Sequence, residues 1–285
     1  MWGSDTGGYL GDPDKEVFAR WMEFSAYSSM MEILIGPKRT IWDDFDNELV
    51  DITKKYTNAH HDLIPYTRSY MYAATKTGMP VMRSLIFAYP DDKKLADAWD
   101  EYLFGPEILV APVVKPGATE RVVYLPTGRW IDYNDKKTVY TGPVSISVSA
   151  PLGTIPLFVR EGAVIPRGNI FKANNNWDAN WEAKLRIEVF PSSKVAGEMD
   201  YYTGSGVQKI STSQKGSDLE ISFGDLGANG TLEIYFRNPK AVTSNGSHLS
   251  SGTGYQYDSR TQKLSVPFKG ATKLVISNAG SLFGS

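Results

Sequence analysis

The chain has 285 residues, 41% hydrophobic and 22% charged, the balance of a globular protein long enough for about two domains. Its formal net charge is −2 at pH 7, and its lysines and arginines are scattered, so no electrostatic case exists for binding nucleic acid or an acidic membrane. Cysteine is absent, which excludes disulfides, thiolate metal sites and a cysteine nucleophile.

Two glycosylation sequons, at Asn229 and Asn245, bear on the compartment. They favour a secreted protein only slightly, because such triplets are common by chance, and the compartment stays unassigned. The longest apolar stretch, from Ile108 to Val114, is interrupted by Pro112 and falls far short of the ~18–20 residues of a membrane span. No membrane partner is therefore expected.

The opening part of the chain has a helical pattern. An Asp-Pro-Asp segment that can cap a helix precedes apolar residues that recur near the 3.6-residue period from Val17 to Ser25. A short apolar segment, "MMEILIG", follows. The segment "NELVDITKKYTNAHHDLIPYTRSYMYAATKTG" then predicts one long helix or a pair bent at Pro65, and Gly78 is a suitable helix end.

From Met79 onward the pattern is that of strands. "PVMRSLIFAY", "EILVAPVV", "ERVVYLP", "VSISVSAP" and "IPLFVREGAVIPRG" are rich in β-branched residues and separated by Gly, Pro and Asp turns. The Asn-rich "NIFKANNNWDANW" is expected to be a loop. After it, "KLRIEVFP", "GEMDYYTG", "DLEISFG", "GTLEIYFRN" and "KLVISNAG" predict the short, evenly spaced strands of a β-sandwich.

The opening part also poses a packing problem. Its helices have apolar faces that need a sheet to cover them, but it contains too few strands to form one. Strands that alternate with helices are the repeating unit of a (β/α)8 barrel. We therefore expect an α/β part, the last units of such a barrel at residues 1–80, and then two all-β sandwich domains at residues 81–170 and 171–285.

Several segments together resemble glycoside hydrolase family 31, which includes α-glucosidases and α-xylosidases. "WGSDTGGY" is similar to the family's Trp/His-Asp-Ile-Gly-Gly-Phe segment. The similarity continues through "EVFARWMEFSAYSSMM", "LIPYTRSYMYAATKTGMPVMRSLIFAYPDD", "YLFGPEILVAPVVKPGATERVVYLPTGRWIDY" and "APLGTIPLFVREGAVIP". The final hundred or so residues match only in position, as the family's distal β-domain.

The resemblance implies a retaining α-glycosidase that hydrolyses terminal α-linked glucosyl or xylosyl residues of oligosaccharides. In such enzymes the nucleophile Asp and the acid/base Asp precede the segment that resembles residues 2–9, so both are expected upstream of Met1. The chain is then expected to begin inside a longer polypeptide, to need the N-terminal part of the same enzyme as its partner, and to be inactive alone. No metal or organic cofactor is expected, since the chemistry uses carboxylates. A transglycosylase of the same family and a non-catalytic carbohydrate-binding module are the alternatives.

Asp5 and Trp2 are the first candidate substrate-binding residues. The resemblance places Asp5 at the end of a barrel strand, where its carboxylate would accept hydrogen bonds from sugar hydroxyls or contact a pocket residue. A turn-forming Asp ahead of Gly7 and Gly8 is the alternative. Trp2 lines the same pocket or packs in the core.

The segment "MMEILIG" departs from the family pattern. Many relatives have an Arg and then a sugar-binding His in this strand. Aligned on Met31, those positions become Glu32 and Leu34, and a one-residue slip places Ile35 where the His would be. We expect these three residues to contact the substrate. Glu32 supplies a replacement acceptor or is a buried or salt-bridged strand residue.

Trp42 completes the candidate set. It follows the strand on the side expected to face the substrate. Asp43 and Asp44, which come next, help to shape the pocket or cap the following helix. His60 and His61 are adjacent in the long helical segment, so their side chains point to different faces, and packing or capping is expected of them rather than metal binding.

Overall fold

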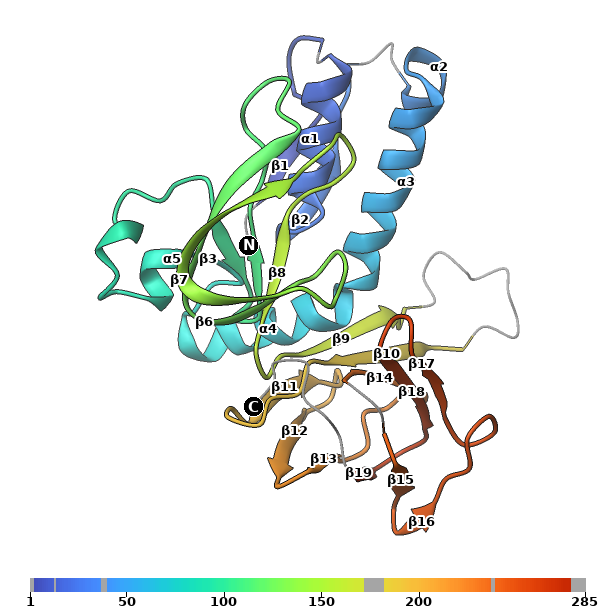
Figure 1. Cartoon of the computed structure of the whole chain (residues 1–285). Coiled ribbons are helices and arrows are strands. Elements are labelled where there is room, and N and C mark those ends of the chain that lie inside the picture. Colours follow the sequence, from blue (N-terminus) through green and yellow to red (C-terminus); the bar gives the residue numbers. More distant parts are fainter. Residues whose placement is uncertain (1–2, 13, 37–39, 172–181, 237–238, 278–285) are drawn as a thin grey trace. The chain divides into compact units, whose positions relative to one another are not determined.

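The structure is a computed structural model that describes residues 3–12, 14–36, 40–171, 182–236 and 239–277. The chain divides into two compact units, each described here by itself (Figure 1). The first unit contains Met1–Asp62, Ala73–Gly128 and Thr141–Phe158, and the second contains Leu63–Tyr72, Arg129–Tyr140 and Val159–Ser285. The domain limits expected from the sequence, after residues 80 and 170, stay predictions.

The first unit begins with a strand–helix–strand element. Strands β1 (Gly3–Thr6) and β2 (Met30–Ile33) pair in parallel and are joined by helix α1 (Lys15–Ser25). The helix begins where the sequence predicts, because the Asp14 carboxylate accepts a hydrogen bond from the Val17 amide at 2.8 Å. Parallel strands joined by a helix are the unit from which (β/α)8 barrels are built.

A short helix, α2 (Ile41–Asp44), precedes the two long helices α3 (Asn47–Asp62) and α4 (Ile64–Thr77). The helical segment is interrupted at Leu63, just ahead of Pro65. The predicted pair of helices is therefore confirmed, and the alternative of one long helix is wrong. Gly78 ends α4 as predicted, with φ of +73° and its amide 2.9 Å from the Ala74 carbonyl oxygen. None of the described helices is long and apolar enough to span a membrane.

The following strands form a six-stranded sheet, in the order β3-β4-β5-β8-β6-β7. Their bounds are β3 Met82–Ser84, β4 Tyr102–Phe104, β5 Ile108–Val110, β6 Glu120–Asp132, β7 Val139–Ser149 and β8 Leu157–Arg160. The strand predicted in "PVMRSLIFAY" shrinks to β3, because a helical turn, α5 (Leu85–Ala88), takes up the rest. A 3-10 turn, η1 (Lys93–Leu95), precedes β4. Short apolar runs do not distinguish strand from helix by periodicity alone, and here the helical turn buries Leu85.

Helices α1 and α3 of the first unit both bind the loop between β7 and β8. The Gly153 amide donates to Glu23 Oε1 at 2.7 Å, and Tyr56 donates its hydroxyl to the Gly153 carbonyl oxygen at 3.0 Å. The Arg20 guanidinium donates to the Ala150 carbonyl oxygen at 2.8 Å and to Glu23. Burial raises the pKa of Glu23, and the Arg20 charge opposes that shift. The helices thus hold the main chain of this loop in place.

The second unit contains two further sheets, in the orders β17-β18-β14-β10-β9 and β11-β12-β13-β19-β15-β16. The first consists of β9 Val164–Asn169, β10 Lys184–Val189, β14 Gly230–Tyr235, β17 Gln256–Asp258 and β18 Lys263–Phe268. The second consists of β11 Gly197–Tyr202, β12 Val207–Lys215, β13 Asp218–Phe223, β15 Ala241–Ser244, β16 Ser247–His248 and β19 Thr272–Ser277.

These two sheets pack as the predicted sandwich. Alternate residues of β13, namely Leu219, Ile221 and Phe223, are buried, and the Phe223 ring lies 5.1 Å from that of Phe268 on the other sheet. Strand β9 joins the five-stranded sheet through an antiparallel pairing with β10.

A buried carboxylate, Glu188 on β10, lies in the same unit. Arg167 approaches it at 3.2 Å, and Lys136 and Tyr133 also bind it. Burial alone would raise the pKa of Glu188, but the charges of Lys136 and Arg167 hold it well below its usual value. The carboxylate is therefore ionised in the core. Its removal would leave Lys136 and Arg167 without their anionic partner.

Candidate functional site

The β1–β2 pair brings two predicted site residues together. Asp5 and Glu32 are register partners in the parallel pairing, each the third residue of its four-residue strand. Register partners point to the same face of a sheet, so the two carboxylates share one face near the carboxyl ends of both strands. Both residues are exposed, so Glu32 is not a buried strand residue.

Helix α1 covers the opposite face of β1. The Trp21 indole donates to Ser4 Oγ at 2.7 Å, and the hydroxyls of Thr6 and Ser25 lie 2.6 Å apart. Since Ser4 and Thr6 alternate with Asp5 along the strand, the carboxylate of Asp5 points away from α1. In a (β/α)8 barrel the helices lie outside and substrates bind at the carboxyl ends of the strands.

A glycine turn fixes the end of β1. The Gly8 amide donates to the Asp5 carbonyl oxygen at 2.8 Å, and Gly7 and Gly8 have φ of +100° and +98°. A Cβ at Gly7 would lie 2.5 Å from Ile35 Cγ2 and 2.7 Å from the Leu34 carbonyl oxygen. The turn uses the main-chain oxygen of Asp5 and leaves its carboxylate out of the turn's hydrogen bonds.

Leu34 and Ile35 follow directly after β2. The Leu34 amide continues the ladder by donating to the Thr6 carbonyl oxygen at 2.8 Å, and both side chains are half-buried. Ile35 packs against the Gly7 turn. The structure therefore places both residues beside Thr6 and Gly7 at the end of β1.

Trp42 lies on α2 and is 71% exposed. The two acidic residues after it bind the start of their own helix. The Asp43 amide donates to Thr40 Oγ1 at 3.2 Å, and the Thr40 amide donates to the Asp44 carboxylate at 2.5 Å. They thus cap α2, whereas the Asp46 carboxylate accepts a hydrogen bond from the first turn of α3.

The histidines and Trp2 complete the sequence candidates. His60 Nδ1 lies 3.1 Å from the Ala26 carbonyl oxygen, and burial lowers the pKa of its ring against the effect of that hydrogen bond. Trp2 lies outside the described residues. Within the part of the chain that the structure describes, no group of three or more His, Asp or Glu side chains could hold a metal ion.

Met30 is a residue of the Asp5–Glu32 face that the sequence analysis did not identify. It pairs with Gly3 in the register, and its side chain is 45% exposed. The sequence could have indicated it, because Met30 precedes Glu32 by two positions and alternate residues of a strand lie on the same face. Apolar and acidic groups thus share this face. The substrate-binding roles of these residues stay predictions.

Comparison with known families assigns the chain. Residues 1–70 match the "Glycosyl hydrolases family 31 TIM-barrel domain" and residues 78–165 match the "Glycosyl hydrolase family 31 C-terminal domain". The chain belongs to glycosyl hydrolase family 31. The predicted fold class is thereby confirmed: the end of the family's barrel is followed by β-sheet domains.

Curated proteins similar to the chain are named for different activities. The chain is 34% identical to "Alpha-glucosidase 2" of Bacillus thermoamyloliquefaciens over 59% of its length and 22% of that protein. It is 33% identical to the "Alpha-xylosidase" of Saccharolobus solfataricus, over 72% of its length and 28% of that protein. It is 28% identical to the "Isomaltosyltransferase" of Sporosarcina globispora, over 90% of its length and 26% of that protein.

A solved structure is similar over almost the whole chain. It is the family 31 dextranase of Flavobacterium johnsoniae in complex with glucose, with a TM-score of 0.85 and 29% identity over 97% of this chain and 39% of that one. The chain spans between a fifth and three tenths of the length of the three curated relatives above. It therefore corresponds to only part of a family 31 enzyme.

Proposed function

We propose that the chain is the C-terminal part of a retaining α-glycosidase that hydrolyses terminal α-linked glucosyl or xylosyl residues of oligosaccharides. The observation that carries the proposal is the pairing of Asp5 with Glu32 on the face of β1–β2 that points away from α1. In a complete barrel this is the inner face at the substrate end. The activities of the family members named above support an α-glucoside or α-xyloside as substrate.

The catalytic pair is assigned to an upstream part of the enzyme. Retaining glycosidases need two carboxyl groups ~5–5.5 Å apart, a nucleophile and an acid/base, on opposite sides of the scissile bond. Asp5 and Glu32 are neighbours on one face of β1–β2, and in this proposal they accept hydrogen bonds from hydroxyls of the sugar ring. The division into a barrel part at 1–80 and two β-sandwich domains at 81–170 and 171–285 belongs to the same proposal.

In this proposal, the specificity for the sugar comes from hydrogen bonds between its hydroxyls and the carboxylates of Asp5 and Glu32. A site whose acceptors bind particular hydroxyls discriminates strongly against sugars that lack them, since the carboxylate is then left unpaired. Leu34 and Ile35 offer no polar group to the sugar, so Glu32 carries the recognition that a donor side chain would otherwise supply. Trp42 and Trp2 are proposed to contact the substrate through their rings.

Transglycosylation is the second candidate. It is favoured by one observation, the similarity to the isomaltosyltransferase over 90% of the chain. In that reaction a sugar hydroxyl, rather than water, attacks the glycosyl-enzyme intermediate. Product analysis with and without an added acceptor sugar distinguishes the two reactions.

The test measures kcat/KM on p-nitrophenyl α-glucoside and α-xyloside for the chain co-expressed with the polypeptide encoded upstream of residue 1. Hydrogen bonds to a charged group contribute about 1.5–3 kcal/mol, so Asp5→Asn and Glu32→Gln should each lower kcat/KM by roughly 10- to 150-fold. Asp51→Asn, an exposed carboxylate on α3 that pairs with Lys54, is the matched control and should leave it unchanged. Full activity of Asp5→Asn, or activity of the chain alone, would overturn the proposal.

A further inference from the structure

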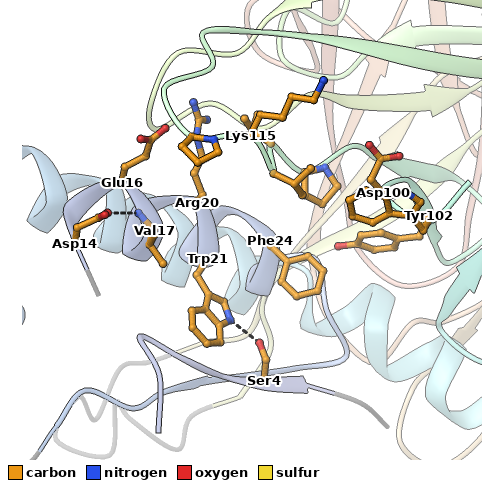
Figure 2. A pocket seen from close by; sticks show the side chains of 15 residues that line it. Ser4, Asp14, Glu16, Val17, Arg20, Trp21, Phe24, Asp100, Tyr102 and Lys115 are labelled. Atoms are coloured by element: carbon orange, nitrogen blue, oxygen red, sulfur yellow. Dashed lines mark hydrogen bonds between the residues drawn. The ribbon is translucent and has the colours of Figure 1, made fainter. Parts of the chain in front are cut away.

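Two hollows of the described chain differ in chemistry. The larger, of about 590 Å³, lies beside α1, and its walls include the apolar side chains of Val17, Trp21 and Phe24 (Figure 2). Its Trp21 indole is already bound to Ser4. A smaller hollow, of about 240 Å³, lies in the second unit and is lined mostly by polar side chains, with one tyrosine among them. The two linings therefore suit different classes of ligand.

The smaller hollow lies on the outer face of the five-stranded sheet. Leu232 of β14 and Val266 of β18 are buried in the sandwich. The residues that alternate with them point to the opposite face, and three of these line the hollow, namely Thr231, Ser265 and Pro267. Gln256, on the edge strand β17, is the register partner of Ser265 and therefore shares this face. The floor of the hollow is thus built on three neighbouring strands.

A tight glycine loop forms one wall of this hollow. The Gly252 amide donates to the Tyr255 carbonyl oxygen at 2.8 Å, and the Gly254 amide donates to the Ser250 carbonyl oxygen at 2.8 Å. Gly252 has φ of +85°, and a Cβ at Gly254 would lie 2.9 Å from Leu249 Cβ. The main chain that carries Tyr255 is therefore fixed before any ligand binds, which lowers the entropic cost of binding.

The lining is polar without being charged. It includes four hydroxyls and one side-chain amide, those of Thr231, Thr253, Tyr255, Ser265 and Gln256, and none of the lining residues carries a formal charge. Hydroxyls and side-chain amides both donate and accept hydrogen bonds. Within the described part of the chain, no hydrogen bond uses any of these five side-chain groups. All five are therefore available to a ligand.

The lack of charge selects a neutral ligand. Phosphate and carboxylate groups are bound in proteins mainly by Arg and Lys, which this lining lacks, whereas a hollow on the other sheet is lined by Lys209 and Lys273. A tyrosine ring beside hydroxyls and an amide matches a sugar, which has an apolar ring face and hydroxyls around its edge. A volume of 240 Å³ is below the ~300–1,000 Å³ of pockets for drug-sized ligands, so it suits a single sugar ring.

We propose that this hollow is a second carbohydrate-binding site, which holds one sugar ring of a neutral α-glucan chain. The ring face packs on Tyr255, and the sugar hydroxyls exchange hydrogen bonds with Gln256 and with the serine and threonine hydroxyls of the lining. The site belongs to the second unit, whereas Asp5 and Glu32 belong to the first. The choice of an α-glucan as the ligand rests on the proposed function. A second attachment point on the same chain strengthens the binding of a long glucan over that of a single sugar.

The experiment measures binding of the purified full chain to dextran and to soluble starch by affinity electrophoresis in native gels. It uses Asp5→Asn as the parent, so that the Asp5–Glu32 face lacks one of its acceptors. Tyr255→Ala should raise the apparent Kd at least about fivefold, because it removes the ring on which the sugar packs. Gln256→Ala should raise it roughly 2- to 12-fold, because it removes hydrogen bonds to sugar hydroxyls.

Two features of the design keep the result interpretable. Thr243→Val, which removes a half-buried hydroxyl from β15 on the other sheet, is the matched control and should leave the apparent Kd unchanged. Gln256 is exposed, so Gln256→Ala should keep the urea midpoint of the parent and tests the site even where Tyr255→Ala disturbs the loop.

The outcomes separate this inference from the proposed function. An unmodified chain that neither dextran nor starch retards would overturn the second site, as would retardation of Gln256→Ala and Tyr255→Ala equal to that of their parent. An equal loss in Thr243→Val would do the same. Full activity of Asp5→Asn on p-nitrophenyl α-glycosides, combined with weaker dextran binding by Gln256→Ala, would overturn the proposed function and support the second site.

Discussion

Replacing Gly7 or Gly8 with alanine tests how the turn after β1 holds the Asp5–Glu32 face. Both glycines have φ near +100°, a conformation that costs an alanine of order 1–3 kcal/mol. The surroundings differ. At Gly7 the added Cβ would lie 2.5 Å from Ile35 Cγ2 and 2.7 Å from a main-chain oxygen, whereas at Gly8 the nearest atom is the Leu10 carbonyl oxygen at 3.3 Å.

The clash adds a second cost at Gly7 only. Overpacking a rigid site costs typically about 1–3 kcal/mol, so Gly7→Ala should lower the free energy of unfolding by about 2–6 kcal/mol and Gly8→Ala by about 1–3 kcal/mol. Urea unfolding followed by tryptophan fluorescence measures both on the purified chain. Equal losses in the two variants would refute the reasoning, because they would show that the end of β2 does not limit the space at Gly7.

Two further predictions concern titratable side chains, the buried Glu188 and the half-buried His60. Glu188→Gln removes the carboxylate that binds Lys136 and Arg167, so it should cost about 3–5 kcal/mol of stability in a urea titration, while Glu198→Gln, which breaks only the exposed pair with Lys209, should change little. Because the pKa of His60 is lowered in the folded chain, the unfolded chain binds more protons than the folded chain when the pH falls below the ordinary histidine pKa of 6.5. The free energy of unfolding should therefore decrease as the pH falls from about 7.5 to 5.5. His60→Gln should flatten that part of the pH profile, and an unchanged slope would show that His60 is not its source.

Local signals in the sequence were sufficient for α1 and for the break between α3 and α4. Asp14 is a capping residue at the right distance from the first apolar position, Pro65 cannot continue a helix without disturbing it, and Gly78 supplies a positive φ. Each of these effects acts within one or two turns of chain. For that reason the ends of α1 and α4 and the break between the long helices agree with the structure.

The ends of the strands depend on pairing with neighbouring strands, which the sequence of the strand itself does not reveal. Strand β6 continues past Pro126 to Asp132, although the proline suggested an end. Strand β12 is largely polar and was not identified, yet it is paired on both sides, by β11 and β13. In both places tertiary pairing outweighs the preference of the segment itself.

The candidate site shows the same division. Sequence motifs identified Asp5 and Glu32 one at a time, but their juxtaposition follows from the parallel register of β1 and β2, which spans 27 positions of chain. A shift of one residue would have moved one carboxylate to the face under α1. The use of Asp43 and Asp44 in capping hydrogen bonds likewise depends on Thr40 being the residue at which α2 begins.

The way in which α1 and α3 hold the loop between β7 and β8 has an evolutionary consequence. Arg20, Glu23 and Tyr56 reach main-chain atoms of this loop, and Gly153 is the one loop residue whose lack of a side chain matters, with Ile52 at 3.1 Å from where a Cβ would be. Homologues should therefore be free to exchange the exposed loop residue Pro151, while changes at the three helix positions should arise together or not at all.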